Sequence, residues 1–309
     1  MFRATPVGIV PSEPKICRSE KMLWLGSCFA ESMQSYLERY QFQALVNPMG
    51  VIFHPEVMAR LMVLEPVTLT MGNFLSDGIW KNWWLGVPFF AHTEAELNHQ
   101  ILVAHGELKN QIANCSWLVC TWGTAFLYKH ATLGTVGKCH KMPGGLFEKV
   151  RSAPGELVEM WRSLITQIRT QNPELKIILS ISPVRHTRDT LPLNNLSKSI
   201  LKIACQELVE SIPNLYYFPA FEIVMDELRE YRFFKSDGIH PSEETIAYIW
   251  HCFEAQFLAK EETQINRLID KLLEEKAHKP FVARGPSYDK WQASIAGKEA
   301  MLKKMGLAL

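Results

Sequence analysis

Two short stretches of the chain carry side chains that could perform nucleophilic chemistry. The first is an apolar run, residues 22–25, followed by Gly26, Ser27 and Cys28. Glycine permits a tight turn from a strand into a helix, so a nucleophile there would lie at a helix N-terminus. The free N–H groups and the dipole of a helix start favour a thiolate and a developing oxyanion. The same residues also fit a plain helix start, with Ser27 as N-cap and Cys28 as a small buried side chain.

The second stretch lies near the other end of the chain and contains Asp237, Gly238, His240 and Pro241. An Asp three residues before a His can hold the imidazole in one tautomer and stabilise the imidazolium formed by proton abstraction. An Asp-Gly turn ahead of a helix would explain the same residues without any chemistry. Together, however, the two stretches supply the nucleophile, the base and the orienting acid of a catalytic triad.

The segments between them alternate between short apolar runs and helical patterns. Strands are expected at residues 22–25, 116–121, 176–182 and 214–218, and helices at 32–39, 156–170, 195–212 and 243–258. This alternation predicts βα units and a parallel sheet.

Two regions depart from this alternation. Residues 72–92 contain three of the 9 Trp residues and little periodicity, which indicates an insertion or a small packed subdomain. Residues 259–309 are charged and helical, with a loop at 280–287, and predict a C-terminal helical extension. We expect one α/β domain over residues 1–258 and the extension after it.

The bulk composition excludes several classes of protein. The 309 residues are 47% hydrophobic and 21% charged with a net charge of +1, which gives no reason to expect a nucleic-acid partner. Prolines interrupt the N-terminal segment and no run of apolar residues is long enough to span a bilayer, so we expect a cytoplasmic protein without a membrane partner. Seven cysteines without a CxxC pair disfavour disulfides and structural zinc, and we expect neither metal nor cofactor.

Several stretches resemble one bacterial-type family. LGSCFAES (residues 25–32) resembles the signature that names the GSCFA family, a relative of the SGNH (GDSL-like) esterases. Further stretches resemble it in order: NPMGVIFHP (47–55), TWGTAFLY (121–128), CHKMP (139–143), SPVRHTRD (182–189), NNLSKS (194–199) and YFPAFEIVMDELREYRFF (217–234). The resemblance implies a three-layer α/β/α sandwich with a parallel sheet.

The resemblance also implies a site. An ungapped overlay of Gly26-Ser27-Cys28 on the Gly-Asp-Ser of SGNH enzymes places Cys28 in the position of the nucleophile. A slip of one residue would make Ser27 the nucleophile instead. Asp237 and His240 complete the triad in either register.

The expected oxyanion hole is less complete. The N–H of Cys28 is expected to act with the loop of Gly123 and Thr124, and with Gly50 or Asn47 in the remaining position. The loop of Gly123 lacks the Asn that SGNH enzymes carry there, which weakens the case for ester hydrolysis.

Two further residues could bind substrate. Arg185 and His186 follow the strand at 176–182, at the edge of a parallel sheet where ligands bind. Arg185 could clamp a carboxylate or phosphate, or it could anchor a loop. Cys139 and His140 are adjacent, but no further candidate metal ligand accompanies them in the sequence. An isolated Cys-His pair is more typical of a structural role than of a metal site.

The implied function is acyl transfer. The chain would be an esterase, a thioesterase or an O-acyltransferase that acts on an acylated small molecule, sugar or peptide, free or bound to a carrier. The alternative is a non-catalytic SGNH-fold binding protein with a degraded oxyanion hole.

Overall fold

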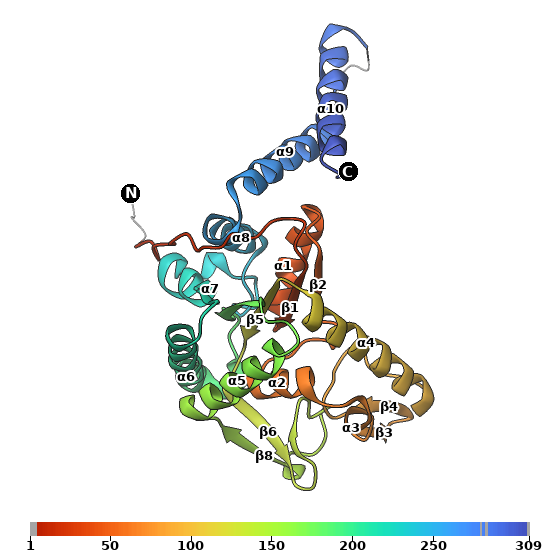
Figure 1. Cartoon of the computed structure of the whole chain (residues 1–309), viewed down its shortest axis with the longest axis vertical. Helices are drawn as coiled ribbons and strands as arrows, with labels where there is room; N and C mark the ends of the chain where they lie inside the picture. The colour runs from red at the N-terminus through yellow and green to blue at the C-terminus, as the bar shows by residue number, and fades with distance from the viewer. Residues whose placement is uncertain (1–4, 279, 282–283, 308–309) are drawn as a thin grey trace.

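The computed structural model describes residues 5–278, 280–281 and 284–307. Its longer elements are drawn in Figure 1. The strands are β1 (Met22–Gly26), β2 (Ala44–Val46), β3 (Asn73–Ser76), β4 (Ile79–Asn82), β5 (Trp117–Trp122), β6 (Phe126–His130), β7 (Gly134–Val136), β8 (Phe147–Arg151), β9 (Lys176–Ile181) and β10 (Leu215–Phe218). The helices are α1 (Cys28–Arg39), α2 (Pro55–Val63), α3 (Pro66–Thr70), α4 (Glu94–Asn114), α5 (Pro154–Arg169), α6 (Thr190–Ser211), α7 (Ala220–Glu222), α8 (Glu243–Phe257), α9 (Lys260–Ala277) and α10 (Pro286–Lys304).

Five parallel strands form the central sheet in the order β10-β9-β5-β1-β2. The chain starts at β1, adds β2 on one side and then β5, β9 and β10 on the other. The order therefore reverses between β1 and β5. In doubly wound sheets of this kind the loops diverge at the reversal point and leave a crevice at the carboxyl ends of the strands, where ligands bind. The loop of Gly26 follows β1 and the loop of Gly123 follows β5, so both lie at this crevice.

Helices cover both faces of the sheet (Figure 1). Side chains alternate along β1, so that Leu23 and Leu25 join one apolar cluster while Met22 and Trp24 join the other. The first cluster is completed by α2, α4, α5 and α6, and the second by α1, α8 and α9. The predicted three-layer α/β/α sandwich is confirmed.

Every strand and helix expected from the sequence is present, but several elements were not expected. The unassigned region before β5 contains α2 and the long helix α4. Residues 72–92 contain the antiparallel hairpin of β3 and β4, and β7, β6 and β8 form a third sheet. The sequence did not predict these elements, because their strands are short and largely half-exposed, and because Leu102 and Val103 of α4 are exposed apolar residues, which blurs the helical periodicity.

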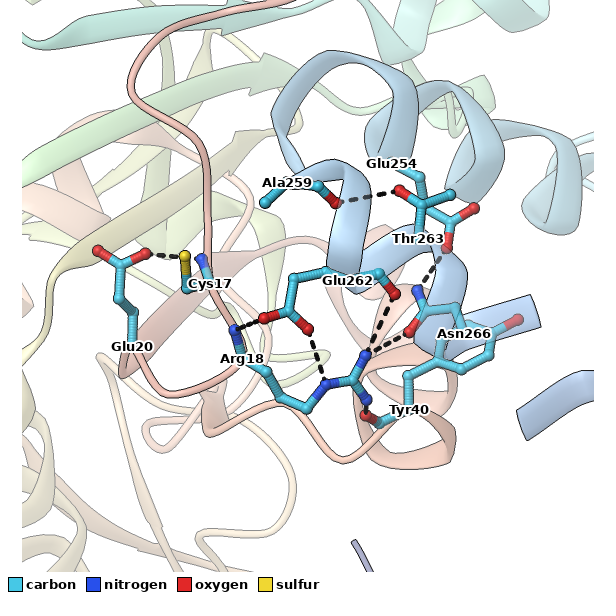
Figure 2. A network of polar contacts seen from close by, with 9 residues as sticks. All are labelled: Cys17, Arg18, Glu20, Tyr40, Glu254, Ala259, Glu262, Thr263 and Asn266. Carbon is cyan, nitrogen blue, oxygen red and sulfur yellow. Dashed lines mark hydrogen bonds and ion pairs between the residues drawn. The ribbon is translucent and has the colours of Figure 1, made fainter. Parts of the chain in front are cut away.

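The C-terminal helices are attached to the α/β body through a buried polar network (Figure 2). Arg18 pairs with Glu262 on α9 at 3.0 Å, donates to Asn266 at 2.6 Å and also donates to the carbonyl of Tyr40 at the end of α1. Ile269 of α9 adds an apolar contact with the second cluster. The division of the chain at residue 258 stays a prediction. Within the described ranges, no helix combines the length and the apolar character needed to cross a bilayer.

Candidate active site

The turn between β1 and α1 requires glycine at position 26. Gly26 has a φ of +151°, and a Cβ placed there would lie 2.0 Å from the Oγ1 of Thr121 on β5. The N–H of Gly26 donates to the Oδ1 of Asn47 at 2.8 Å, and the N–H of Ser27 donates to Thr121 Oγ1 at 3.2 Å. Side chains of β5 and of the loop after β2 therefore fix the turn, and with it the start of α1.

Ser27 is the N-cap of α1 and is only 1% exposed. Its Oγ accepts the N–H of Phe29 at 3.2 Å and donates to the Oγ of Ser182 at 2.8 Å. Cys28, the first residue of α1, is half-buried. The geometry gives Ser27 a capping role and leaves Cys28 as the more accessible of the two candidate nucleophiles.

The thiol of Cys28 is not ionised by its surroundings. Burial raises its pKa, and the carboxylate of Glu31 raises it further. The N–H of Cys28 itself, the ammonium of Lys198 and the N–H of Phe29 lower the pKa by less. The expectation that a helix start makes Cys28 a thiolate is therefore wrong for the resting site, because desolvation of the charge outweighs the amides. A nucleophilic Cys28 needs a general base to take its proton.

Asp237 and His240 form a hydrogen-bonded pair in the loop before α8. The Oδ2 of Asp237 lies 2.7 Å from the Nδ1 of His240, and its Oδ1 accepts the N–H groups of Ile239 and His240 at 2.8 and 3.0 Å. These hydrogen bonds, those from His240 above all, hold the pKa of Asp237 well below its usual range. An ionised carboxylate at Nδ1 fixes the proton there and leaves Nε2 as the basic nitrogen.

Arg185 anchors the loop that carries this pair. Its Nη1 donates to the carbonyl of Gly238 at 2.9 Å, its backbone N–H lies 3.5 Å from the next carbonyl of the loop, and its guanidinium carbon lies 4.1 Å from the ring centroid of Phe234. Ser182, three residues before Arg185 in the loop after β9, accepts a hydrogen bond from Ser27. The loop after β9 therefore contacts both stretches, and Arg185 has the anchoring role that was the alternative to a substrate clamp.

Two of the expected oxyanion donors are already paired. The N–H of Gly50 donates to the carbonyl of Asn47 at 2.8 Å, and the N–H of Gly123 donates to the carbonyl of Phe53 at 2.7 Å. The hydroxyl of Thr124 lies 3.1 Å from a serine hydroxyl of α6. Gly50 and Gly123 thus hold the loops of the crevice together and have no N–H left for an oxyanion in this arrangement.

Two other donors remain beside the turn. The side chain of Asn47 is held by its Oδ1, which accepts from Gly26, while its buried Nδ2 has no hydrogen-bond partner among the described residues. The N–H of Cys28 opens α1, and its hydrogen bond toward the thiol of the same residue lowers the pKa of that thiol. A buried donor without a partner costs free energy, which a bound oxyanion would recover.

Lys198 on α6 was not expected at the site. Its side chain is 1% exposed, and its Nζ donates to the carbonyl of Gly123 at 2.6 Å and to that of Ser182 at 2.7 Å. Burial lowers the pKa of Lys198 to about 7, while the charge of Cys28 acts against this shift. A lysine in a helix is usually exposed, so the residues 194–199 gave no signal that it turns inward.

His186 lies next to Gly123, where a Cβ would approach its Nε2 to 3.2 Å. Its ring meets the ring of Phe53 edge-on, with the centroids 5.4 Å apart. Burial lowers the pKa of His186 to about 4, and the ammonium of Lys198 lowers it as well. The imidazole is therefore neutral near pH 7. Its predicted role in substrate binding stays a prediction, now with a place at the crevice.

Cys139 and His140 have structural surroundings. The Nε2 of His140 lies 2.7 Å from the carbonyl of Asn82, and its ring packs edge-on against Phe74. Burial raises the pKa of Cys139. Across residues 5–278, 280–281 and 284–307, no three His, Cys, Asp or Glu side chains gather as a metal site would require.

A doubly wound parallel sheet, with a cysteine at the reversal point and an Asp-His pair in a neighbouring loop, places the molecule among the α/β proteins whose site lies at the carboxyl ends of the strands. Residues 21–253 match the model of the GSCFA family, and the chain belongs to that family.

The similarity of this structure to solved structures is low in both sequence identity and TM-score. A carbohydrate esterase family 2 enzyme with a carbohydrate-binding domain, from Corynascus thermopiles (Myceliophthora fergusii), is 10% identical, with 84% of this chain and 68% of that chain covered and a TM-score of 0.39. A carbohydrate esterase family 3 protein from Talaromyces cellulolyticus is 10% identical, with 82% and 99% covered and a TM-score of 0.36. Among curated protein sequences, none matches this chain significantly.

Proposed function

We propose that this protein is an acyl-transfer enzyme of the esterase type, with Cys28 as nucleophile, His240 as general base and Asp237 as the residue that orients His240. The observation that carries the proposal is the Asp237–His240 pair at 2.7 Å, in a loop bound to the same β9 loop that holds Ser27. The resemblance of the two stretches to those of SGNH esterases supports the class of reaction.

The first half of the reaction acylates the enzyme. His240 takes the proton of the Cys28 thiol, and the sulfur attacks the carbonyl carbon of an ester or thioester. The bond to the leaving oxygen or sulfur then breaks as His240 returns the proton to it, so that a thioester remains on Cys28. The raised pKa of Cys28 makes this base necessary, since little thiolate exists at neutral pH.

The second half releases the acyl group. Water, or a hydroxyl of an acceptor, gives its proton to His240 and attacks the thioester, and the proton then returns to the sulfur of Cys28. Hydrolysis and transfer differ only in this acceptor. The acyl donor would be an acylated small molecule, sugar or peptide, free or bound to a carrier.

The negative oxygen formed in both halves needs donors that are not already paired. We assign the Nδ2 of Asn47 to this role, because it has no acceptor among the described residues, together with the N–H of Cys28 at the start of α1. Removing a single oxyanion donor typically costs on the order of 10²–10³ in rate. Asn47→Ala should therefore slow turnover far more than it weakens substrate binding.

Intact-protein mass spectrometry after mixing with 4-nitrophenyl acetate tests the proposal. We expect one acetyl adduct in the wild type and in Ser27→Ala, and none in Cys28→Ala. Cys17→Ala serves as the matched control, because Cys17 is exposed and outside the site. An adduct that persists in Cys28→Ala and maps to Ser27 would show that the enzyme is a serine hydrolase.

One observation favours a second candidate, a binding protein without turnover. The N–H groups of Gly50 and Gly123 are paired within the chain and are not free to bind an oxyanion. Such a protein would form no adduct in the same assay. His240→Ala, which abolishes acylation of the enzyme, would leave its ligand affinity unchanged.

A further inference from the structure

Lys138 carries an ammonium that forms no ion pair with any of the described residues. It follows β7 and is half-buried, and its ammonium makes no hydrogen bond or ion pair within the part of the chain that the structure describes. The ammonium lies over the ring of Phe53, whose centroid is 4.3 Å from Nζ. Lysines are seldom withdrawn from water without a carboxylate or a carbonyl to receive them.

Phe53 ties this ammonium to the catalytic turn. Its carbonyl accepts the N–H of Gly123 at 2.7 Å, and the N–H of the preceding residue, Ile52, donates to the carbonyl of Gly26 at 2.8 Å. The backbone of residues 52–53 therefore links the loops that follow β1 and β5, at the reversal point of the sheet. The methylene groups of Lys138 pack against Gly86, where an added Cβ would lie 3.0 Å from Cε. Both ends of the side chain are thus held in place.

The charges around Lys138 place it near the nucleophile. Burial lowers its pKa to about 8, while the carboxylate of Glu31 and the thiol of Cys28 act in the opposite direction. The charges of Glu31 and Lys138 attract each other, although the two side chains form no ion pair among the described residues. The neutral imidazole of His186 packs on the same Phe53 ring.

Resting on the acyl-transfer function proposed above, we propose that the substrate carries an anionic group, a carboxylate or a phosphate, that binds to Lys138 beside Phe53 and His186. The acyl carbon would then lie at Cys28. A charged group bound there would complete the contacts of an ammonium that the fold holds but does not pair. The substrate would accordingly be a charged acyl compound and not a neutral ester.

Alkylation of Cys28 tests this charge preference without any turnover. Iodoacetate and iodoacetamide both form a bond to the sulfur and release iodide, and they differ in size by little and in charge by one unit. Rates are measured at pH 7, where Lys138, whose pKa burial lowers to about 8, keeps its charge, and Cys28 is followed by peptide mass spectrometry. The ratio of the iodoacetate rate to the iodoacetamide rate cancels the ionisation of the thiol.

We expect Lys138→Met to lower this ratio by roughly fivefold to tenfold, as loss of a partly desolvated charge pair would. Lys138→Arg should keep most of the ratio. Lys129→Met, which removes a charge from an exposed position on β6, should leave it unchanged. Acetate and inorganic phosphate, each compared with chloride at equal ionic strength, show whether a carboxylate or a phosphate protects wild-type Cys28 better.

The outcomes separate this proposal from the proposed function. An equal fall in both rates in Lys138→Met would mean that Lys138 only promotes ionisation of Cys28, and would overturn the anion site. An unchanged ratio, or no protection of the wild type by either anion, would overturn it as well, even if Lys138→Met folds poorly. If the alkylation ratio shows the expected charge preference but mass spectrometry finds no acetyl adduct, the acyl-transfer function is refuted and the anion site is still supported.

Discussion

Replacing Gly26 by alanine should destabilise the fold and disorder the turn between β1 and α1. The new Cβ would lie 2.0 Å from Thr121 Oγ1 and 2.4 Å from the Thr121 carbonyl oxygen, at a φ of +151°. A strained backbone costs about 1–3 kcal/mol and an overpacked site a further 1–3 kcal/mol, so we expect a loss of about 2–6 kcal/mol in the free energy of unfolding. Domains are commonly stable by only about 5–15 kcal/mol, so the effect is large.

Urea unfolding measures this loss, and Gly106→Ala is its control. Gly106 lies in the exposed middle of α4, where an added Cβ meets nothing within 4 Å. There the same substitution should stabilise the protein by about 0.5–1 kcal/mol, because alanine favours helix. Adding Thr121→Ala to Gly26→Ala should restore only part of the loss, since the carbonyl clash remains. If Gly26→Ala unfolds within about 1 kcal/mol of the wild type, the account of the turn is refuted.

Two further predictions concern the electrostatics of the site. Asp237→Asn should fold normally and lower turnover on an activated ester by roughly 10³–10⁴, because the amide would stabilise the tautomer of His240 that cannot accept a proton at Nε2; wild-type turnover in a folded variant would end the triad hypothesis. The pKa of Lys198 is about 7 in the folded protein and near 10.5 in the unfolded chain. Between these two pH values the unfolded chain binds more protons, so the free energy of unfolding should rise with pH in that range. Between pH 7 and 8.5 the wild type should gain on the order of 1–2 kcal/mol relative to Lys198→Met in urea unfolding; stability curves that run parallel for the two proteins would contradict this.

The sequence was sufficient for the framework of the molecule. The continuous apolar runs at 22–25, 116–121 and 176–182 predicted buried parallel strands, because a strand buried on both faces needs such a run. Each of these runs forms a strand of the central sheet. Gly26 marked the turn, since only glycine accepts its backbone geometry without strain. The spacing of Asp237 and His240 predicted their pairing, because a loop of three residues brings such side chains together locally.

Only the tertiary structure decided what each group at the site can do. Whether Ser27 or Cys28 is free to react depends on Ser182, which lies 155 residues away in the chain. The pairing of Gly123 with Phe53 and the inward turn of Lys198 also depend on residues distant in sequence. Local spacing sets the direction of a side chain within its own element, whereas burial, and with it the pKa of Cys28, depends on which elements pack around it. For this reason the sequence named the candidate residues, and the packing of distant elements set their protonation and their free hydrogen-bond donors.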